Sequence, residues 1–290
     1  MTQFIRTCTI VIRIRKEDFS GYDPTPIRIS GLRVSFQIQK NLSWSTNTGT
    51  IRIWNLSRSH RNLIKDFGDE VTVYAGYERG SGEELLYIGD TTTVYHTFDF
   101  PEIITTLECG DGERYVNQKH FSLSFQAGAS AREVIRTIAL RMGIPVTEFA
   151  VSDDLIYDQG FESAGMGKEA LLKACSFLGL QASVQNETLQ IIPVDGVIDE
   201  PEILIDTNNS MIGIPQRYTY KKQNFYVQGP AVGWRVSTLL YPRILPGAKL
   251  NIASGYLGFQ GIFRCETIRH SGDTYGPQWQ SDMEVTQLNP

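Results

Sequence analysis

Three things are scarce in this sequence: cysteine pairs, long apolar runs and surplus basic residues. Its four cysteines, among 290 residues, have no Cys-x-x-Cys or zinc-ligand spacing, so we predict scattered, reduced core thiols. Reduced thiols suit assembly in a cytoplasm. Lys and Arg number 27 against 32 Asp and Glu, a net charge of −5. Because proteins that hold nucleic-acid phosphates are usually basic, general nucleic-acid binding is disfavoured. The cysteines are Cys8, Cys109, Cys175 and Cys265.

No apolar run approaches the length of about 18 residues that a membrane-spanning helix needs, and we expect no membrane span. The first residues lead into alternating apolar and polar positions, without the apolar centre of a signal peptide. Apolar residues make up 41% and charged residues 20%, which is typical of a globular protein. A chain of this length forms a core without disulfide or metal staples.

The N-terminal third has the alternation of half-buried strands. Ser57 is predicted to cap a short helix with Leu63, Ile64 and Phe67 on its apolar face, ending at Gly68. Short strands with Gly-rich turns predict a barrel or sandwich of about 110 residues. The predicted strands cover 9–15, 32–39, 51–54, 70–77, 85–89, 91–98 and 103–109.

The middle of the chain, residues 118–195, is predicted to be a small α+β domain. Ser130 and Glu133 have the spacing of a capping box, and Gly143 fits the left-handed position that ends a helix. A second helix is predicted over 167–178, with Leu171, Leu172, Cys175 and Leu178 on one stripe. A hairpin with its turn at Asn186-Glu187 follows.

After an acidic linker the chain returns to β structure. The prediction is therefore a mainly β protein with an α+β insertion, in which barrel domains at 1–117 and 196–290 flank the α+β domain at 118–195. The later strands are expected at 217–220, 224–227, 234–240, 248–252, 261–269 and 280–287.

Catalytic signatures are absent: the sequence has no HExxH, GxSxG, Walker-type loop or Rossmann fingerprint after a strand. The glycines at 165–168 lack a preceding strand and a Gly-Lys-Ser/Thr ending, so a flexible helix entry is favoured over a phosphate loop. The glycines at 255–261 do not precede a predicted helix, so a hairpin loop is favoured there. No catalytic, cofactor-binding or metal-binding residue is predicted, and no cofactor.

Some residues offer weak chemical alternatives. His270 and Asp273 are close enough for a proton relay, but Gly272 between them favours a turn. Carboxylates near residues 108–113 resemble the pair of a glycosidase, but solvated turn residues are the favoured interpretation.

Basic residues at 13–16, 58–65 and 221–222 are either solvated or contacts for an acidic partner. The tryptophans are either core residues or interface anchors. The carboxylates are Glu108, Asp111 and Glu113, and the tryptophans are Trp44, Trp54, Trp234 and Trp279.

Several motifs follow one another along the chain in a characteristic order. A strand ends in an Asn-Leu-Ser turn at 51–57, a short helix follows, the next strand ends in Ala-Gly-Tyr at 75–77, and Leu86 to Asp90 reads Leu-Tyr-Ile-Gly-Asp. The middle unit has a Ser-capped helix and a Gly-Leu…Leu-x-Ile-x-Pro hairpin. Near the C-terminal end of the sequence, two further segments contribute to the pattern. They are Leu239 to Gly247, and residues 268–274 followed by Trp279. In this order the motifs resemble phage tail baseplate hub proteins over nearly the whole chain.

The resemblance implies a structural protein of the virion, assembled in the host cytoplasm. Such hubs are homotrimers whose subunits each carry two tail-tube-like barrels, so that six barrels match the sixfold tube above and a threefold spike or tip below. The implied partners are the tail tube protein and the central spike or tip protein, together with tape measure and baseplate wedge proteins. DNA would pass only in transit through the channel, and an acidic lining would let it slide.

Four alternatives stay open at this point. A tail-associated peptidoglycan hydrolase would need an acid/base pair or nucleophile. A distal tail protein could share the barrel fold, although the α+β unit between two β regions favours a hub. The hub of a tailocin or other injection machine has the same pattern. A carbohydrate-binding module is compatible with the fold class alone.

Overall fold

The computed structural model describes most of the chain, and its secondary structure is mainly β. The described residues are 4–18, 21–43, 45–64, 67–79, 82–112, 115, 119–151, 155–208, 210–223, 228–255 and 258–288. The α-helices named here are α1 (Arg58–Leu63), α3 (Ala131–Met142) and α4 (Gly167–Ser176). No helix in these ranges is long and apolar enough to cross a membrane.

The strands fall into a large sheet and three small ones. The large sheet contains β1 (Phe4–Arg13), β2 (Ile27–Ile29), β3 (Val34–Asn41), β4 (Thr48–Trp54), β5 (Glu70–Arg79), β6 (Gly82–Asp99), β7 (Glu102–Gly110), β15 (Ile203–Asp206), β16 (Met211–Gln223), β17 (Gln228–Leu239), β18 (Lys249–Ser254), β19 (Phe259–Asp273) and β20 (Trp279–Gln287). The small sheets contain β8 (His120–Phe125), β9 (Ala129–Ser130), β10 (Val146–Phe149), β11 (Ile156–Tyr157), β12 (Phe161–Met166), β13 (Leu180–Gln185) and β14 (Thr188–Pro193).

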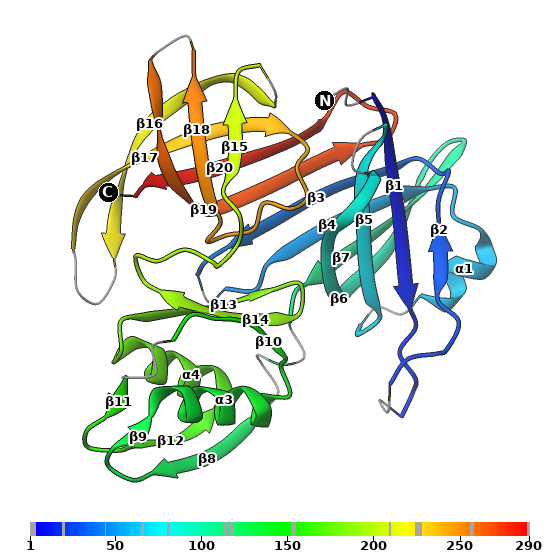
Figure 1. Ribbon diagram of the computed structural model, residues 1–290. Coiled ribbons are helices and arrows are strands. Elements are labelled where there is room, and N and C mark those ends of the chain that lie inside the picture. The colour runs from blue at the N-terminus through cyan, green and yellow to red at the C-terminus, as the bar shows by residue number, and fades with distance from the viewer. Residues whose placement is uncertain are drawn as a thin grey trace.

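The large sheet joins the two β regions of the chain. Its order is β16-β17-β20-β19-β3-β4-β7-β6-β5-β1-β2, with β18 beside β19 and β15 beside β18. The connection is the antiparallel pairing of β19 with β3, from Thr267 opposite Asn41 to Asp273 opposite Ser35. We call this pairing the seam. The predicted class, mainly β with an α+β insertion, is confirmed, and the structure adds that a single sheet runs through both β regions (Figure 1).

Three hydrophobic clusters hold the fold together. The first lies among the N-terminal strands and includes Ile10 of β1 as well as Ile38 of β3. Because β1 and β3 are far apart in the strand order but share this cluster, the sheet curves around it. The second cluster fills the α+β unit around α3 and α4, and the third lies under the C-terminal strands. In Figure 1 the α+β unit lies below the sheet, with β13 and β14 between its helices and the sheet.

The short helix α1 differs from its prediction. Ser57 caps it as expected, since its hydroxyl accepts a hydrogen bond from the backbone N–H of His60. The helix ends at Leu63 because the backbone of Ile64 is already extended. Only Ile64 of the predicted apolar face is buried, whereas Leu63 and Phe67 are exposed. The predicted end at Gly68 was therefore wrong.

The longer helices follow the predicted periodicity more closely. In α3 the apolar residues at helical spacing, Val134, Ile135, Ile138 and Met142, are buried, and Gly143 has the left-handed φ of 78° that ends the helix. Ser130 stands at the N-cap but makes no side-chain cap hydrogen bond, so the predicted capping box does not form. In α4 the buried stripe runs through Leu171 and Cys175. Leu172 is partly exposed because adjacent helical residues are rotated by about 100°.

The strand predictions were better for long alternating segments than for short ones. Residues 85–89 and 91–98, predicted as separate strands, belong to the single long strand β6. The strand expected at 224–227 lies outside the described residues. The short strands β2, β9, β11 and β15 were not predicted, since two to four residues carry too little alternation to be recognised.

Candidate assembly surfaces

The outward face of the large sheet is polar on both sides of the seam. Strand alternation sends Val236, Met283 and Ile268 into the third cluster. Their neighbours point the other way and form rows across the strands. One row runs Ser237, Asp282, Arg269, Gln39, Thr48, and the next runs Gln280, Ser271, Gln37, Thr50, Glu108. We call the face formed by these two rows, together with Arg235 and Glu284, the polar face.

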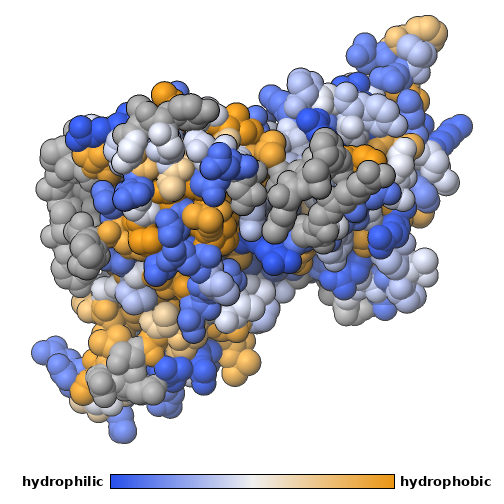
Figure 2. All heavy atoms as spheres, turned by 45° about the horizontal axis from the view of Figure 1, so that its top comes forward, coloured by the Kyte–Doolittle hydropathy of each residue, from blue (hydrophilic) through white to orange (hydrophobic). Residues whose placement is uncertain are grey.

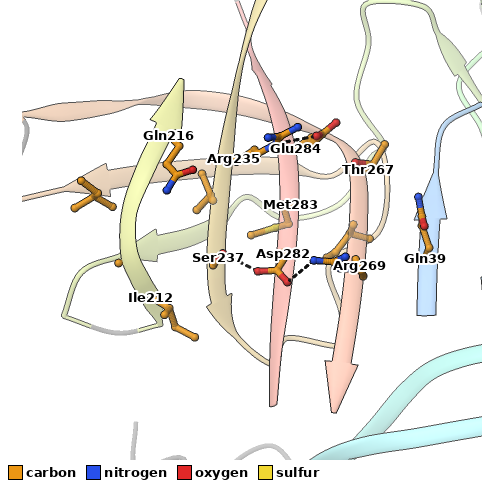
Figure 3. A pocket seen from close by; sticks show the side chains of 14 residues that line it. Gln39, Ile212, Gln216, Arg235, Ser237, Thr267, Arg269, Asp282, Met283 and Glu284 are labelled. Atoms are coloured by element: carbon orange, nitrogen blue, oxygen red, sulfur yellow. Dashed lines mark hydrogen bonds and ion pairs between the residues drawn. The ribbon is translucent and has the colours of Figure 1, made fainter. Parts of the chain in front are cut away.

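A groove lies on the C-terminal half of this face, between β16 and β3 (Figure 3). Its volume is about 570 Å³. Polar side chains from β17, β20, β19 and β3 form its floor, and a bulged segment of β16 forms its wall. The bulge lies between Ile212 and Gln216 and leaves Ile212 and Ile214 39% and 52% exposed. The groove thus has a hydrophilic floor beside a small apolar edge.

The floor of the groove is a lattice of paired charges. Arg235 Nε lies 3.1 Å from Glu284 Oε1, and the two residues are direct cross-strand partners. Arg269 Nη2 lies 3.5 Å from Asp282 Oδ2, and the Ser237 hydroxyl donates to Asp282 Oδ1 at 2.6 Å. Figure 3 shows these contacts as dashed lines. Because both arginines are paired on the face itself, the groove does not present unmatched positive charge to a phosphate backbone.

The end strand β16 offers a long edge for association. It is 13 residues long and pairs with β17 on one side, and it ends the strand order of the sheet. At the other end of the order lies β2, which has only three residues beside β1. Unpaired edges of this kind accept further strands from another chain. The described part of the sheet therefore has end strands at β16 and β2, and a third, β15, on the branch beside β18.

A second protruding feature is the ribbon formed by the end of β6 and the start of β7. Residues 95–99 of β6 are all exposed, so both faces of this ribbon contact solvent. At its tip Phe98 and Phe100 are 81% and 98% exposed. The projection at the upper right of Figure 2 ends in hydrophobic atoms, and the turn between β6 and β7 lies at the corresponding end of Figure 1. Exposed aromatic side chains at a ribbon tip are typical of a contact element.

A buried polar cluster connects the α+β unit to the sheet. The Asp111 carboxylate accepts hydrogen bonds from the backbone N–H groups of Asn186 and Glu187, at 2.7 and 2.6 Å. These two residues form the β13–β14 turn, and both have positive φ. The Asn47 amide donates to Asp111 Oδ2 at 3.1 Å. We call these residues, together with Lys40 and Asp90, the junction cluster.

Lys40 is the most unusual member of the junction cluster. It is fully buried, and its Nζ donates to Asn186 Oδ1 at 2.8 Å. Burial lowers the pKa of Lys40 to about 8, against the opposing effect of Asp111. Burial also raises the pKa of Asp111, while the turn N–H groups, Lys40 and Asn47 oppose that shift. Sequence reasoning missed Lys40, although the alternation Val34, Phe36, Ile38 places it on the apolar side of β3.

The weak catalytic candidates are separated by the fold. His270 is buried, with Nδ1 2.8 Å from the Ser281 hydroxyl. Asp273 instead bonds Arg33 and the backbone N–H groups of the following turn. The two do not form a relay. Burial lowers the pKa of His270 well below its ordinary value, and the charge of Lys40 adds to the effect.

Of the carboxylates near residue 110, the two that the structure describes, Glu108 and Asp111, do not form a pair either. Asp111 is buried in the junction cluster, Glu108 is exposed on the polar face, and Glu113 lies outside the described residues. The expected solvated turn was therefore wrong for Asp111. The 165–168 segment links β12 to α4, and the backbone N–H of Gly167 bonds the Lys119 carbonyl. Part of the 255–261 loop, Tyr256 and Leu257, lies outside the described residues.

The basic groups and tryptophans have mixed roles. Arg13 pairs with Glu70, and Lys65 together with the side chains of 221–222 lies outside the described residues. Trp279 is buried edge-on against Phe36, whereas Trp54 lies under the Arg33 guanidinium at 4.3 Å. Trp234 packs on Phe259, and Trp44 lies outside the described residues. All four cysteines are buried and free, as predicted. No group of three or more metal-ligating side chains occurs in the described part of the chain.

Comparison with protein families decides among the alternatives. The family model described as "Baseplate hub gp41" matches residues 19–222. This match covers most of the chain. The chain belongs to this baseplate hub family. It is therefore a structural component of a phage tail baseplate, and hence of the virion. The family is structural rather than enzymatic, which confirms the expectation that the hub is not an enzyme.

Solved structures show the same fold at low sequence identity. A tail protein from Neisseria meningitidis MC58 matches with a TM-score of 0.66 at 11% identity, covering 96% of each chain. The 43 kDa tail protein of prophage MuSo2 from Shewanella oneidensis matches with a TM-score of 0.65 at 10% identity, again covering 96% of each chain. The E. coli c3393 protein, a type VI secretion component, has a TM-score of 0.58 at 9% identity, covering 89% of the hub and 74% of that chain. Among curated protein sequences, none matches the hub.

Proposed function

We propose that the hub is a homotrimeric symmetry adaptor that joins the sixfold tail tube to the threefold central spike and lines the channel for DNA ejection. Each subunit supplies two tube-like barrel domains, residues 1–117 and 196–290, around the α+β domain at 118–195. Three subunits then present six barrels to the tube. The observation that carries this proposal is the polar face, which continues across the seam from one β region to the other.

The separate hydrophobic clusters support the division into domains. The first cluster lies in the N-terminal β region and the third in the C-terminal β region, while the second cluster belongs to the α+β unit. Two similar β layers joined by backbone pairing give one subunit two neighbouring positions in a ring. Closing the ring requires the β16 end of one subunit to meet the β1–β2 end of the next, which is a head-to-tail contact.

The polar face is suited to line the channel. Its side chains are polar and its two arginines are charge-paired, so DNA meets neither large apolar groups nor unmatched arginines on it. Exchanging Glu108 and Glu284 for Lys is expected to slow ejection while trimers still form. Ejection at the normal rate from such particles would contradict a channel-lining role. The proposed partners are the tail tube protein, the spike or tip protein, and tape measure and wedge proteins, with assembly in the host cytoplasm.

The oligomeric mass of the purified chain tests the proposal directly. Light scattering after size exclusion is expected to give a trimer, and averaged particle images a ring around a pore. Exchanging Ile212 and Ile214 for Glu puts charge on the exposed edge of β16 and should give monomers. Leu140→Glu is the matched control, because Leu140 is an exposed apolar residue on α3, remote from the sheet ends.

Three results distinguish the head-to-tail ring from its alternatives. Trimers in the wild type and in Leu140→Glu, with monomers in the β16 variant, support the head-to-tail ring. A monomeric wild type that stays monomeric with the tube protein present would contradict the adaptor. A trimer that survives both Glu exchanges would place the subunit contact elsewhere than at β16.

A further inference from the structure

Lys40 and Asn186 form a close contact between the large sheet and the α+β unit. Lys40 Nζ donates a hydrogen bond to Asn186 Oδ1 at 2.8 Å, and 146 positions separate the two residues in the chain. Because a carbonyl bond is about 1.2 Å long, this hydrogen bond places Nζ between about 3 and 4 Å from Cγ of the Asn186 amide. The amine and the carbonyl carbon are therefore close to the separation at which such groups react.

We propose that this contact is a site of covalent modification, at which Lys40 Nζ and Asn186 Cγ join in an isopeptide bond that ties the α+β unit to the large sheet. The Nζ lone pair forms the new bond to Cγ, the bond between Cγ and Nδ2 breaks, and one proton passes from Nζ to Nδ2, so that ammonia leaves. The reaction consumes no oxidant, reductant or co-reactant. This modification goes beyond the adaptor function, and it does not depend on trimer formation.

The surroundings of Lys40 favour the neutral amine, which is the form that can attack a carbonyl carbon. The side chain is fully buried, and among the described residues the one hydrogen-bond acceptor of its head group is Asn186 Oδ1. A charged lysine head group has three N–H donors, so a buried one with a single neutral acceptor is poorly stabilised. Burial accordingly lowers the pKa of Lys40 to about 8, although the charge of Asp111 opposes this shift.

Hydrogen bonds on both sides of the contact hold the two reacting groups in place. Asp111 Oδ2 accepts a hydrogen bond from the backbone N–H of Asn186 at 2.7 Å, which fixes the turn that carries the amide. The Gln185 side chain, from the residue before Asn186, donates to the carbonyl of Asn41 at 2.9 Å, and Asn41 follows Lys40 in β3. Because folding has already ordered the residues beside both groups, the amine and the amide meet without a further loss of chain entropy.

Asp111 and the partial exposure of Asn186 suit the transfer of the proton and the departure of ammonia. Burial raises the pKa of Asp111, whose carboxyl group is held against the backbone of Asn186. In the proposed reaction this carboxyl group passes the proton from the attacking amine to the leaving nitrogen, as a general acid and base. Asn186 is only partly buried, so the ammonia formed at its side chain can reach solvent.

The proposed bond connects the seam to the α+β unit. Lys40 belongs to β3, the strand of the seam that comes from the N-terminal β region, and Asn186 belongs to the β13–β14 turn. A cross-link between residues 146 positions apart restricts the unfolded chain strongly, because it closes a long loop. It also keeps the α+β unit attached to the sheet when the hydrogen bonds of the junction cluster open.

Mass spectrometry of the purified full chain tests the proposal. After prolonged incubation of the folded protein, its intact mass should be lower than that of the sequence by the mass of one ammonia molecule. Trypsin does not cleave after an acylated lysine, so digestion of the denatured chain should give peptide 34–52 joined to peptide 174–217. The joined peptides distinguish this bond from an asparagine succinimide, which also forms with loss of ammonia but links no peptides.

Two substitutions remove the reacting groups one at a time. Lys40→Met removes the amine but keeps a long side chain, and Asn186→Gly removes the amide but suits the positive φ of the turn. Each variant should have the full mass of its sequence. Lys249→Met is the matched control, because Lys249 is a partly exposed lysine 3.1 Å from Glu202, which also accepts a hydrogen bond from Asn251. This control should keep the ammonia deficit and the joined peptides.

The proposal fails under either of two results. A wild-type chain with the full mass of its sequence and no joined peptides would mean that the contact is a hydrogen bond only. An ammonia deficit that persists in Lys40→Met or in Asn186→Gly would place the loss of ammonia elsewhere in the chain. Joined peptides in the wild type and in Lys249→Met, together with the full sequence mass in whichever of the two substituted chains folds, support the isopeptide bond.

Discussion

The seam and the junction cluster both join distant parts of the chain, but they do so by different chemistry. The seam is a ladder of backbone hydrogen bonds between β3 and β19, with apolar residues on one face and polar residues on the other. The junction consists of side-chain carboxylates and a lysine closed around a two-residue turn. The seam spreads its stability over many contacts, whereas the junction depends on a few ionisable groups that no water reaches.

Asp111→Ala should have the largest effect, because it breaks the junction at its centre. The substitution leaves Lys40 buried without its charge partner and two turn N–H groups without an acceptor. We expect a loss of about 4 kcal/mol in the free energy of unfolding, measured by urea denaturation. In the Lys40→Met background the loss should be much smaller, and equal losses in both backgrounds would contradict the coupling.

Ile38→Ala tests the apolar side of the seam. Ile38 is fully buried on β3 opposite His270, and truncation leaves a cavity in the first cluster. We expect the free energy of unfolding, measured by chemical denaturation, to fall by about 3 kcal/mol. Gln39→Ala, the adjacent residue on the polar face, should stay within about 0.5 kcal/mol of the wild type. Similar losses for both would mean that the two faces of β3 are not distinct.

Asp273→Ala removes the polar contacts at the end of the seam. Burial alone would raise the pKa of Asp273, but hydrogen bonds from Arg33 and from the N–H groups of Tyr275 and Gly276 hold it below its ordinary value. Asp273 therefore stabilises the fold above its unfolded pKa, and this contribution is lost as the pH falls through the folded value. We expect the free energy of unfolding to fall by about 1 kcal/mol at neutral pH, and this loss to disappear in acid. Melting curves recorded at several pH values measure it.

Glu284→Gln should have the smallest effect on stability. Its ion pair with Arg235 lies on the solvated polar face, where water and salt screen the attraction. The change in unfolding free energy should be less than about 0.5 kcal/mol by the same denaturation assay. A loss comparable with that of Asp111→Ala would mean that the polar face is buried in the assembled form under study.

Sequence patterns predicted the long elements well and the contacts between them poorly. Alternation in 32–39 identified β3, and the helical period between Ser130 and Gly143 identified α3, because each pattern repeats along a single element. The ending of α1 and the exposure of Leu172 were missed, since the backbone is already extended at Ile64 and Leu172 is rotated by about 100° from the buried Leu171. Asp111 was interpreted as a solvated turn residue, because its three hydrogen-bond donors come from residues 47, 186 and 187.

The sequence by itself determined the mainly β class, the α+β insertion and the order of motifs that resembles the hub family. These properties depend on local alternation, helical period and turn residues, which are written along the chain. Only the tertiary structure decided that both β regions share a sheet through β3 and β19, and that Asp111 meets the turn at Asn186 and Glu187. Both contacts join residues more than 70 positions apart, and the burial that raises the pKa of Asp111 exists only after the chain has folded around it.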